Sequence, residues 1–191
     1  VVLAAVLAAV RLTGVPLPEH RVVIHGAGTA GVGIADLIRE AMARAGTPPE
    51  DTHAAFYTLN SRGLVVEDSE GVRDFQRPYA RTRAEVAGWT VADPHRITLE
   101  EVVREVRPTI LIGTSARHGA FSEEVVTTMA AHCERPIIMP LSNPTSRSEA
   151  HPADVLAWTE GRALIATGSP FGTIRHGETY HTIAQANNAL I

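Results

Sequence analysis

The sequence contains no lysine, and all 17 of its basic side chains are arginines. A reaction that needs a lysine as general base must therefore take that residue from outside this chain. Cysteine is almost absent as well, because Cys133 is the only one. A lone cysteine excludes an internal disulfide framework and is typical of a reducing compartment, so we expect a cytoplasmic protein.

An excess of positive charge is also lacking. The formal net charge is -4 at pH 7 and the pI is about 6.1. Nucleic-acid binding needs a concentrated positive surface, and peripheral binding to an anionic membrane makes the same demand. The composition therefore argues against nucleic-acid and membrane partners.

No apolar run is long enough to cross a bilayer, which takes about 20 residues. Residues 1–10 consist only of Val, Leu and Ala, and they lack the basic start of a secretory signal peptide. Gly14, followed by Pro16 and Pro18, is typical of a helix end. We interpret the run as a truncated, buried N-terminal helix, and we expect the chain to be a fragment of a larger protein.

The most informative stretch is residues 21–33, where an apolar, β-branched run meets three spaced glycines and then a helical pattern. This order predicts a strand, a tight turn and a helix N-terminus. Gly26 permits the turn, Gly28 lets backbone amides approach a pyrophosphate, and Gly31 lets the helix pack close to the strand. Unpaired N–H groups and the positive helix end favour a phosphate there. The pattern alone is equally typical of an ordinary strand-to-helix turn.

Apolar runs alternate with helical patterns along the rest of the chain. This alternation predicts a parallel sheet that is covered by helices on both faces. The expected fold is therefore α/β, a Rossmann-type doubly wound parallel sheet with three layers, formed by residues 1–191 as one dinucleotide-binding domain. We expect further strands at residues 54–59, 109–113, 136–141 and 163–167, and helices at residues 29–45, 98–106, 122–132 and 152–161.

Small or polar residues stand at the end of every expected strand, which is where ligands of open α/β sheets bind. We expect these strand ends to line one crevice and to hold a dinucleotide. The strand ends are Gly26, Asn60, Thr114, Ser142 with Asn143, and Thr167 to Ser169. The candidate cofactor-binding residues are Gly26, Ala27, Gly28, Thr29, Ala30, Gly31, Asn60, Ser61, Arg62, Thr114, Ser115, Ser142 and Asn143.

Asn60 occupies the place where an acidic residue would accept hydrogen bonds from both ribose hydroxyls of NAD. Arg62 follows two residues later, and an arginine there pairs with the extra phosphate of NADP. The pattern thus leaves the choice between NAD and NADP open. Residues 60–63 are also typical of a simple turn, whichever cofactor binds.

Three other features of the sequence carry groups that bind phosphates, metal ions or carboxylates in proteins. Residues 77–83 combine arginines with a tyrosine, but such charge runs favour a solvated loop with a short helix over a phosphate site. The nine histidines lack metal-ligand spacing, so we expect no metal site in this chain. Asn187 and Asn188 carry amides that suit a substrate carboxylate, with a turn cap as the alternative.

Five segments together point to a known family. They are Gly26-Ala27-Gly28-Thr29-Ala30-Gly31, Pro140-Leu141-Ser142-Asn143-Pro144-Thr145, Trp158-Thr159-Glu160-Gly161-Arg162-Ala163-Leu164, Ala166-Thr167-Gly168-Ser169-Pro170-Phe171 and Gln185-Ala186-Asn187-Asn188.

Through these segments the chain resembles the malic enzyme family over nearly its whole length. The resemblance implies oxidative decarboxylation of L-malate to pyruvate and CO2, with NAD or NADP reduced and a divalent Mg or Mn ion polarising a carbonyl. It implies that residues 26–31 hold the pyrophosphate, that Asn143 contacts substrate and nicotinamide, and that Asn187 and Asn188 hold the malate carboxylate.

The resemblance also places the family's catalytic tyrosine and lysine, and its acidic metal ligands, N-terminal to the matched region. The chain alone is then expected to bind the cofactor without performing the reaction, and the complete enzyme to be a homo-oligomer. Asn60 stands where the family usually has an aspartate.

Two alternatives remain beside an NAD-dependent malic enzyme. Residues 77–83 and 185–190 resemble the malolactic enzymes, close relatives that use NAD and release lactate, whereas Ser169-Pro170-Phe171 resembles the malic enzymes. The other alternative is a non-catalytic module that senses a dinucleotide, since fold alone does not separate the two classes.

Overall fold

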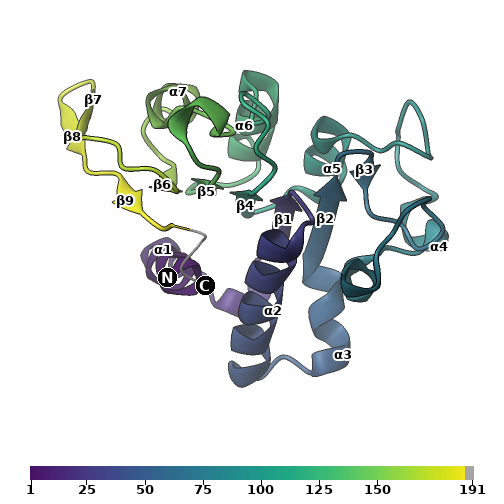
Figure 1. Cartoon of the computed structure of the whole chain (residues 1–191). Helices are drawn as coiled ribbons and strands as arrows, with labels where there is room; N and C mark the ends of the chain where they lie inside the picture. The colour runs from purple at the N-terminus through teal and green to yellow at the C-terminus, as the bar shows by residue number, and fades with distance from the viewer. Residues whose placement is uncertain (188–191) are drawn as a thin grey trace.

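A seven-stranded sheet forms the centre of the molecule (Figure 1), and the computed structural model describes residues 1–187 of the chain. The strand order is β3-β2-β1-β4-β5-β6-β9; β3 is antiparallel to β2, and the other neighbours are parallel. The bounds are β1 Val22–His25, β2 Phe56–Asn60, β3 Gly63–Leu64, β4 Ile110–Gly113, β5 Ile137–Pro140, β6 Leu164–Thr167 and β9 Ala184–Gln185, with β7 Ile174–His176 and β8 Thr179–His181 in a separate hairpin.

Helices cover both faces of this sheet, so the predicted doubly wound, three-layer architecture is confirmed. In β1, Val22 and Ile24 belong to the core on the α1 and α2 side, whereas Val23 belongs to the core on the α5, α6 and α7 side. Helical segments are α1 Val2–Thr13, η1 Leu17–Glu19, α2 Thr29–Arg44, α3 Pro49–Thr52, η2 His53–Ala55, η3 Asp74–Tyr79, α4 Arg83–Val86, α5 Leu99–Val106, α6 Glu123–Ala130, η4 Thr145–Arg147 and α7 Pro152–Trp158.

Most predicted boundaries fall within a few residues of the observed ones because local signals fix them. Helix α1 ends at Thr13, and its C-cap Gly14 has a left-handed φ of 73°. Thr98 and Ser122 cap α5 and α6 by accepting backbone N–H bonds. Helix α6 ends at Ala130, two residues before the expected 132, and β2 begins later than expected because residues 53–55 form a 3-10 turn.

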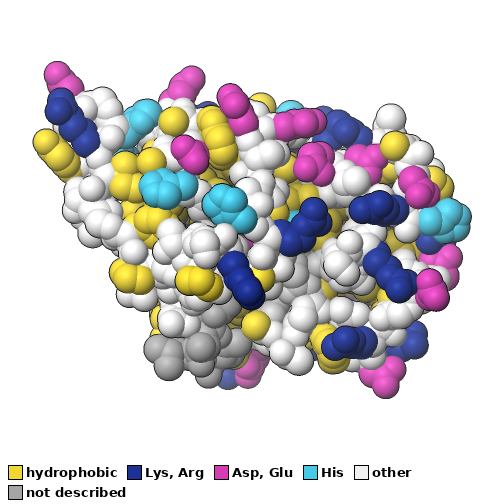
Figure 2. Space-filling model, turned by 45° about the horizontal axis from the view of Figure 1, so that its top comes forward, with side chains coloured by type: hydrophobic (Ala, Val, Ile, Leu, Met, Phe, Trp, Pro, Cys, Tyr) yellow, Lys and Arg dark blue, Asp and Glu magenta, His cyan; other side chains and the backbone are white. Residues whose placement is uncertain are grey.

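Charged side chains of both signs lie interspersed on the face shown in Figure 2, which brings the upper end of the Figure 1 view forward. This is the end towards which the β1 and β2 arrows point in Figure 1. None of the helices in residues 1–187 has the length and apolar character needed to cross a membrane.

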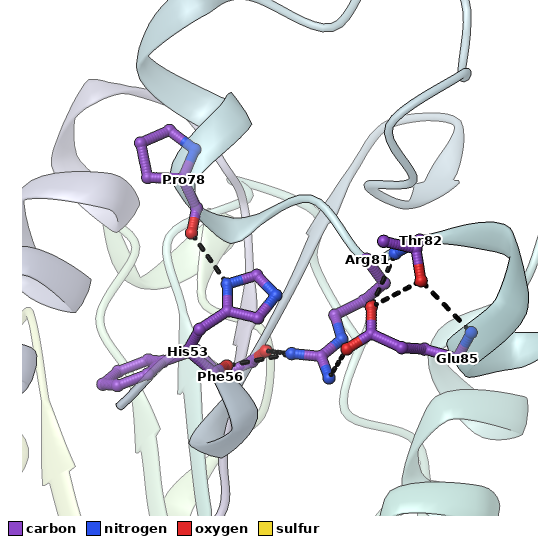
Figure 3. A network of polar contacts seen from close by, with 6 residues as sticks. All are labelled: His53, Phe56, Pro78, Arg81, Thr82 and Glu85. Atoms are coloured by element: carbon purple, nitrogen blue, oxygen red, sulfur yellow. Dashed lines mark hydrogen bonds and ion pairs between the residues drawn. The ribbon is translucent and has the colours of Figure 1, made fainter. Parts of the chain in front are cut away.

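The prediction of a solvated loop for residues 77–83 is wrong in its centre, although the expected short helix is present as α4. Tyr79 is fully buried and Arg81 is 4% exposed. The Arg81 guanidinium donates to the carbonyl of His53 at 2.9 Å and to Glu85 at 2.6 Å, as Figure 3 shows. It also stacks on the Tyr57 ring, with its central carbon 4.6 Å from the ring centroid. Runs of charged residues are usually exposed, but ion pairing and stacking on an aromatic ring allow this arginine to be buried.

Candidate dinucleotide site

A pocket of about 380 Å³ opens at the carboxyl ends of β1, β2 and β4. Strand β1 leads into α2 on one face of the sheet, and β4 leads into α6 on the other face. The pocket therefore lies at the topological switch point where open α/β sheets bind ligands. Its lining includes the predicted residues Gly26, Ala27, Gly28, Asn60, Ser61, Arg62, Thr114 and Ser115.

The three glycines of the first turn have different surroundings. A Cβ at Gly26, whose φ is 121°, would lie 2.4 Å from the Thr114 carbonyl carbon, and a Cβ at Gly31 would lie 2.1 Å from the Gly26 oxygen. These two glycines are therefore required by close backbone packing. At Gly28 nothing lies within 4 Å of such a Cβ. Gly28 thus borders open space in the pocket, where a ligand atom would fit.

Helix α2 begins at this pocket without a side-chain cap and without an acidic residue in its first turn. By contrast, Thr98 and Ser122 cap α5 and α6, and both of those helices have glutamates in the first turn. The first N–H groups of a helix have no partner within the helix, and its dipole is positive at that end. The first turn of α2, which carries Thr29, Ala30 and Gly31, is therefore suited to an anion such as a phosphate.

Hydrogen bonds from neighbouring segments hold the glycine turn in place. The N–H groups of Gly26 and Ala27 both donate to the Leu59 carbonyl at 2.8 Å. The Thr114 hydroxyl donates to the Gly26 carbonyl at 2.8 Å, and the buried Gln76 amide donates to the Ala27 carbonyl. Gln76 also lines the pocket. Sequence reasoning missed it because nothing in residues 67–92 shows that this segment crosses the glycine turn.

At the end of β2, Asn60 takes part in a turn. Its side-chain oxygen accepts the Arg62 N–H at 2.8 Å. The Arg62 guanidinium forms an ion pair of 3.0 Å with Glu70, whose carbonyl it also contacts. Both Arg62 and Glu70 line the pocket. The arginine that the sequence pattern assigned to the extra phosphate of NADP is therefore paired with a carboxylate.

A buried glutamate that the sequence did not single out connects the ends of β4 and β5. Glu149 is fully buried, and its carboxylate accepts bonds from the backbone and the hydroxyl of Ser115. It accepts a further hydroxyl bond from Ser142 at 2.6 Å. The predicted residue Ser142 therefore points inward, away from the pocket. No local signal identifies Glu149, because its partner Ser115 lies 34 residues earlier in the chain.

The remaining predicted residues lie farther along the same edge of the sheet. Asn143 is exposed, and its side-chain oxygen accepts the Ser169 hydroxyl at 2.6 Å. Asn187 is half-buried just beyond β9, the strand next to β6. Asn188 lies outside the described residues. None of these residues lines the 380 Å³ pocket, so the structure divides the expected crevice into a β1–β2–β4 part and a β5–β6–β9 part.

His25 lies in the lining of the pocket at the end of β1. It is 5% exposed, and among the described residues its Nδ1 atom has no hydrogen-bond partner. Burial lowers the pKa of His25, and the nearby Arg117 guanidinium lowers it further. The imidazole is therefore neutral at pH 7.

No three His, Cys, Asp or Glu side chains come together as a metal-binding group within residues 1–187.

Comparison with known proteins gives a match to the family model "Malic enzyme, NAD binding domain" over residues 1–191. The chain is 53% identical over 191 residues to NAD-dependent malic enzyme 3 of Bacillus subtilis, covering 99% of this chain and 34% of that protein. It is 43% identical over 191 residues to the NAD-dependent malic enzyme of Pseudomonas aeruginosa, and the match covers 100% of this chain and 34% of that protein. The chain thus spans about a third of the length of these relatives.

Solved structures show the same fold. The crystal structure of the NAD-dependent malic enzyme from Thermotoga maritima superposes with a TM-score of 0.63 at 23% identity, over 98% of this chain and 40% of that one. The crystal structure of the Entamoeba histolytica malic enzyme gives a TM-score of 0.61 at 23% identity, over 90% of this chain and 32% of that one.

Proposed function

Since the chain belongs to the malic enzyme family and matches its NAD-binding domain, we propose that it binds NAD across the carboxyl ends of β1, β4 and β5 and serves the oxidation and decarboxylation of L-malate to pyruvate and CO2. Bound NAD supplies the hydride acceptor for that reaction. The proposal assigns the chain to the cofactor domain of a longer enzyme, whose other part carries the acid–base residues.

The observation that carries the proposal is the uncapped N-terminus of α2 beside the open space at Gly28. A pyrophosphate there would accept N–H bonds from the first turn of α2 and face the positive end of the helix dipole. The adenosine ribose would then reach the end of β2, near Asn60 and the Arg62–Glu70 pair. The nicotinamide would point the other way, towards Ser142 and Asn143 at the end of β5.

On this placement the polar groups at the β5–β6–β9 edge would meet the malate. The amides of Asn143 and Asn187, with Asn188, are proposed to hold substrate by donating N–H bonds to its carboxylate oxygens. The same assignment makes the complete enzyme a cytoplasmic homo-oligomer that uses a divalent Mg or Mn ion bound outside the described residues.

Calorimetric titration of the chain with NAD, and separately with NADP, tests the proposal. We expect heat of binding with NAD and a weaker association with NADP, because Glu70 pairs with Arg62 and adds negative charge near the 2′-phosphate. Tighter binding of NADP would assign Ser61 and Arg62 to the 2′-phosphate and overturn the NAD assignment. If neither dinucleotide binds, the proposal that this chain by itself forms the dinucleotide site is contradicted.

A second measurement addresses the reaction. When the enzyme that contains this domain is incubated with L-malate and NAD, we expect pyruvate and NADH to accumulate together. Release of lactate without net NADH would instead identify a malolactic enzyme.

A further inference from the structure

Glu149 lies below the site, between the loops that follow β4 and β5. Its Oε1 atom accepts the Ser115 N–H at 2.7 Å, the Ser115 hydroxyl at 2.9 Å and the Ser142 hydroxyl at 2.6 Å. Its Oε2 atom accepts the Ser142 N–H at 3.3 Å. The side chain is fully buried. A single side chain therefore connects two strand-end loops, each of which carries a predicted cofactor residue.

The direction of these bonds requires an acceptor at this place. The Ser142 hydroxyl oxygen already accepts the Ala116 N–H at 2.9 Å, and the Ser115 hydroxyl oxygen accepts the Arg117 N–H at 3.2 Å. Each hydroxyl has a single proton, and both point it at Glu149. With two backbone N–H groups added, four donors face the carboxylate, which is acceptor-only when ionised.

The surrounding backbone is shaped to keep the carboxylate there. The Glu149 carbonyl accepts the Phe121 N–H at 2.9 Å, so the segment before α7 is held against the start of α6. A Cβ at Gly113 would lie 2.5 Å from the Glu149 carboxyl carbon. The last residue of β4 therefore has no room for a side chain while Glu149 is in this position.

We propose that Glu149 is a positioning residue for the dinucleotide, which sets the distance and orientation between the Ser115 loop and the Ser142–Asn143 loop so that both fit one bound NAD. This inference rests on the proposed function. Ser115 lines the pocket at the switch point, whereas Asn143 follows Ser142 directly. A shift of one loop against the other would leave the adenosine half of the site intact and misplace the groups that meet the nicotinamide half.

Glu149→Gln tests the inference in the full chain. The amide keeps the shape of the carboxylate but brings a donor to one of its two ends, where it would meet an N–H or hydroxyl donor. We expect the variant to bind NAD about tenfold more weakly, while its affinity for 5′-AMP, which carries only the adenosine half, changes less than twofold. Amide hydrogen exchange should become faster at Ser115, Ala116 and Ser142.

Glu85→Gln is the matched control, because Glu85 also accepts backbone, hydroxyl and guanidinium bonds, from Thr82 and Arg81 (Figure 3), and lines none of the pockets described. Its substitution should lower the melting temperature without changing the ratio of NAD to AMP affinity. Ser142→Ala removes one of the four donors and should weaken NAD binding in the same direction as Glu149→Gln, but less.

The outcomes separate the two proposals. If the unsubstituted chain binds NAD and Glu149→Gln leaves the NAD-to-AMP ratio unchanged, or if Glu85→Gln changes that ratio equally, the positioning role is overturned and the proposed function stands. If the unsubstituted chain binds no NAD, the proposed function fails and the positioning role fails with it.

Discussion

The fold has room for a side chain at Gly28, whereas the proposed pyrophosphate does not leave room for one. Its φ of -81° is available to every amino acid, and nothing lies within 4 Å of a Cβ placed there. A larger residue is therefore compatible with the fold but occupies the place of the pyrophosphate. This separates Gly28 from Gly26 and Gly31, which the backbone itself requires.

We expect Gly28→Val to reduce NAD affinity at least tenfold, which is about 1.4 kcal/mol, with little change in the free energy of unfolding. Calorimetric titration and urea unfolding measure the two quantities. Gly88→Val is the control, because Gly88 also has open space around it and lies outside the pocket. Equal NAD affinity in the two variants would remove the phosphate role from the first turn of α2.

The charge of the side chain at position 60 is expected to affect the relative affinity for NAD and NADP. Asn60→Asp keeps the oxygen that accepts the Arg62 N–H at 2.8 Å, so the turn should survive. The aspartate carboxylate would accept a hydrogen bond from a ribose hydroxyl, and its negative charge would repel a 2′-phosphate. We expect the ratio of NAD to NADP affinity to rise about tenfold by calorimetry, which corresponds to about 1.4 kcal/mol. An unaltered ratio would show that Asn60 does not face the ribose.

At the scale of elements, the contact between α2 and the end of β1 depends on the absence of one methyl group. A Cβ at Gly31 would lie 2.1 Å from the Gly26 carbonyl oxygen, which is backbone and unable to rotate away. We expect Gly31→Ala to lift α2 from the sheet and to lower the free energy of unfolding by about 1–3 kcal/mol, as overpacking does. Urea midpoints measure this loss. Gly28→Ala is the matched control one turn earlier, and an equal stability of both variants would contradict the close packing.

The same scale shows which elements the sequence could predict. Helices α5, α6 and α7 carry their own start signals in Thr98, Ser122 and Pro152, and these signals act within a few residues. Strands β3 and β9 have two residues each, too few for any periodicity, and they exist only because β2 and β6 offer unpaired edges. The hairpin of β7 and β8 was missed for the same reason of length.

At the scale of the whole molecule, the site is assembled by contacts that no local pattern contains. The glycine turn was predictable because its function needs particular residues at fixed spacing. Glu149 and Gln76 were not, because Glu149 binds Ser115 and Gln76 binds Ala27, each of which is distant from it in sequence. The burial of Arg81 has the same origin, since its partners His53 and Phe56 precede it by more than twenty residues. Long-range polar contacts therefore explain why sequence reasoning missed these three residues.

Two buried histidines should make the stability of the whole domain depend on pH. Burial lowers the pKa of His20 and of His25 below the ordinary value of 6.5. His20 is held by Thr109, whose hydroxyl oxygen lies 2.9 Å from its Nδ1 atom. As the pH falls through 6.5, the unfolded chain takes up protons that the folded chain does not, so the free energy of unfolding decreases.

We therefore expect full stability above pH 7.5 and a progressive loss between pH 7 and pH 5, measured as urea midpoints across that range. His25→Phe removes one of the two groups while keeping a planar ring beside Phe121, whose ring centroid lies 6.4 Å away. The variant should lose less stability on acidification than the unsubstituted chain. An identical decline would mean that His25 takes up its proton equally well in the folded state, which would contradict the burial of its Nδ1 atom.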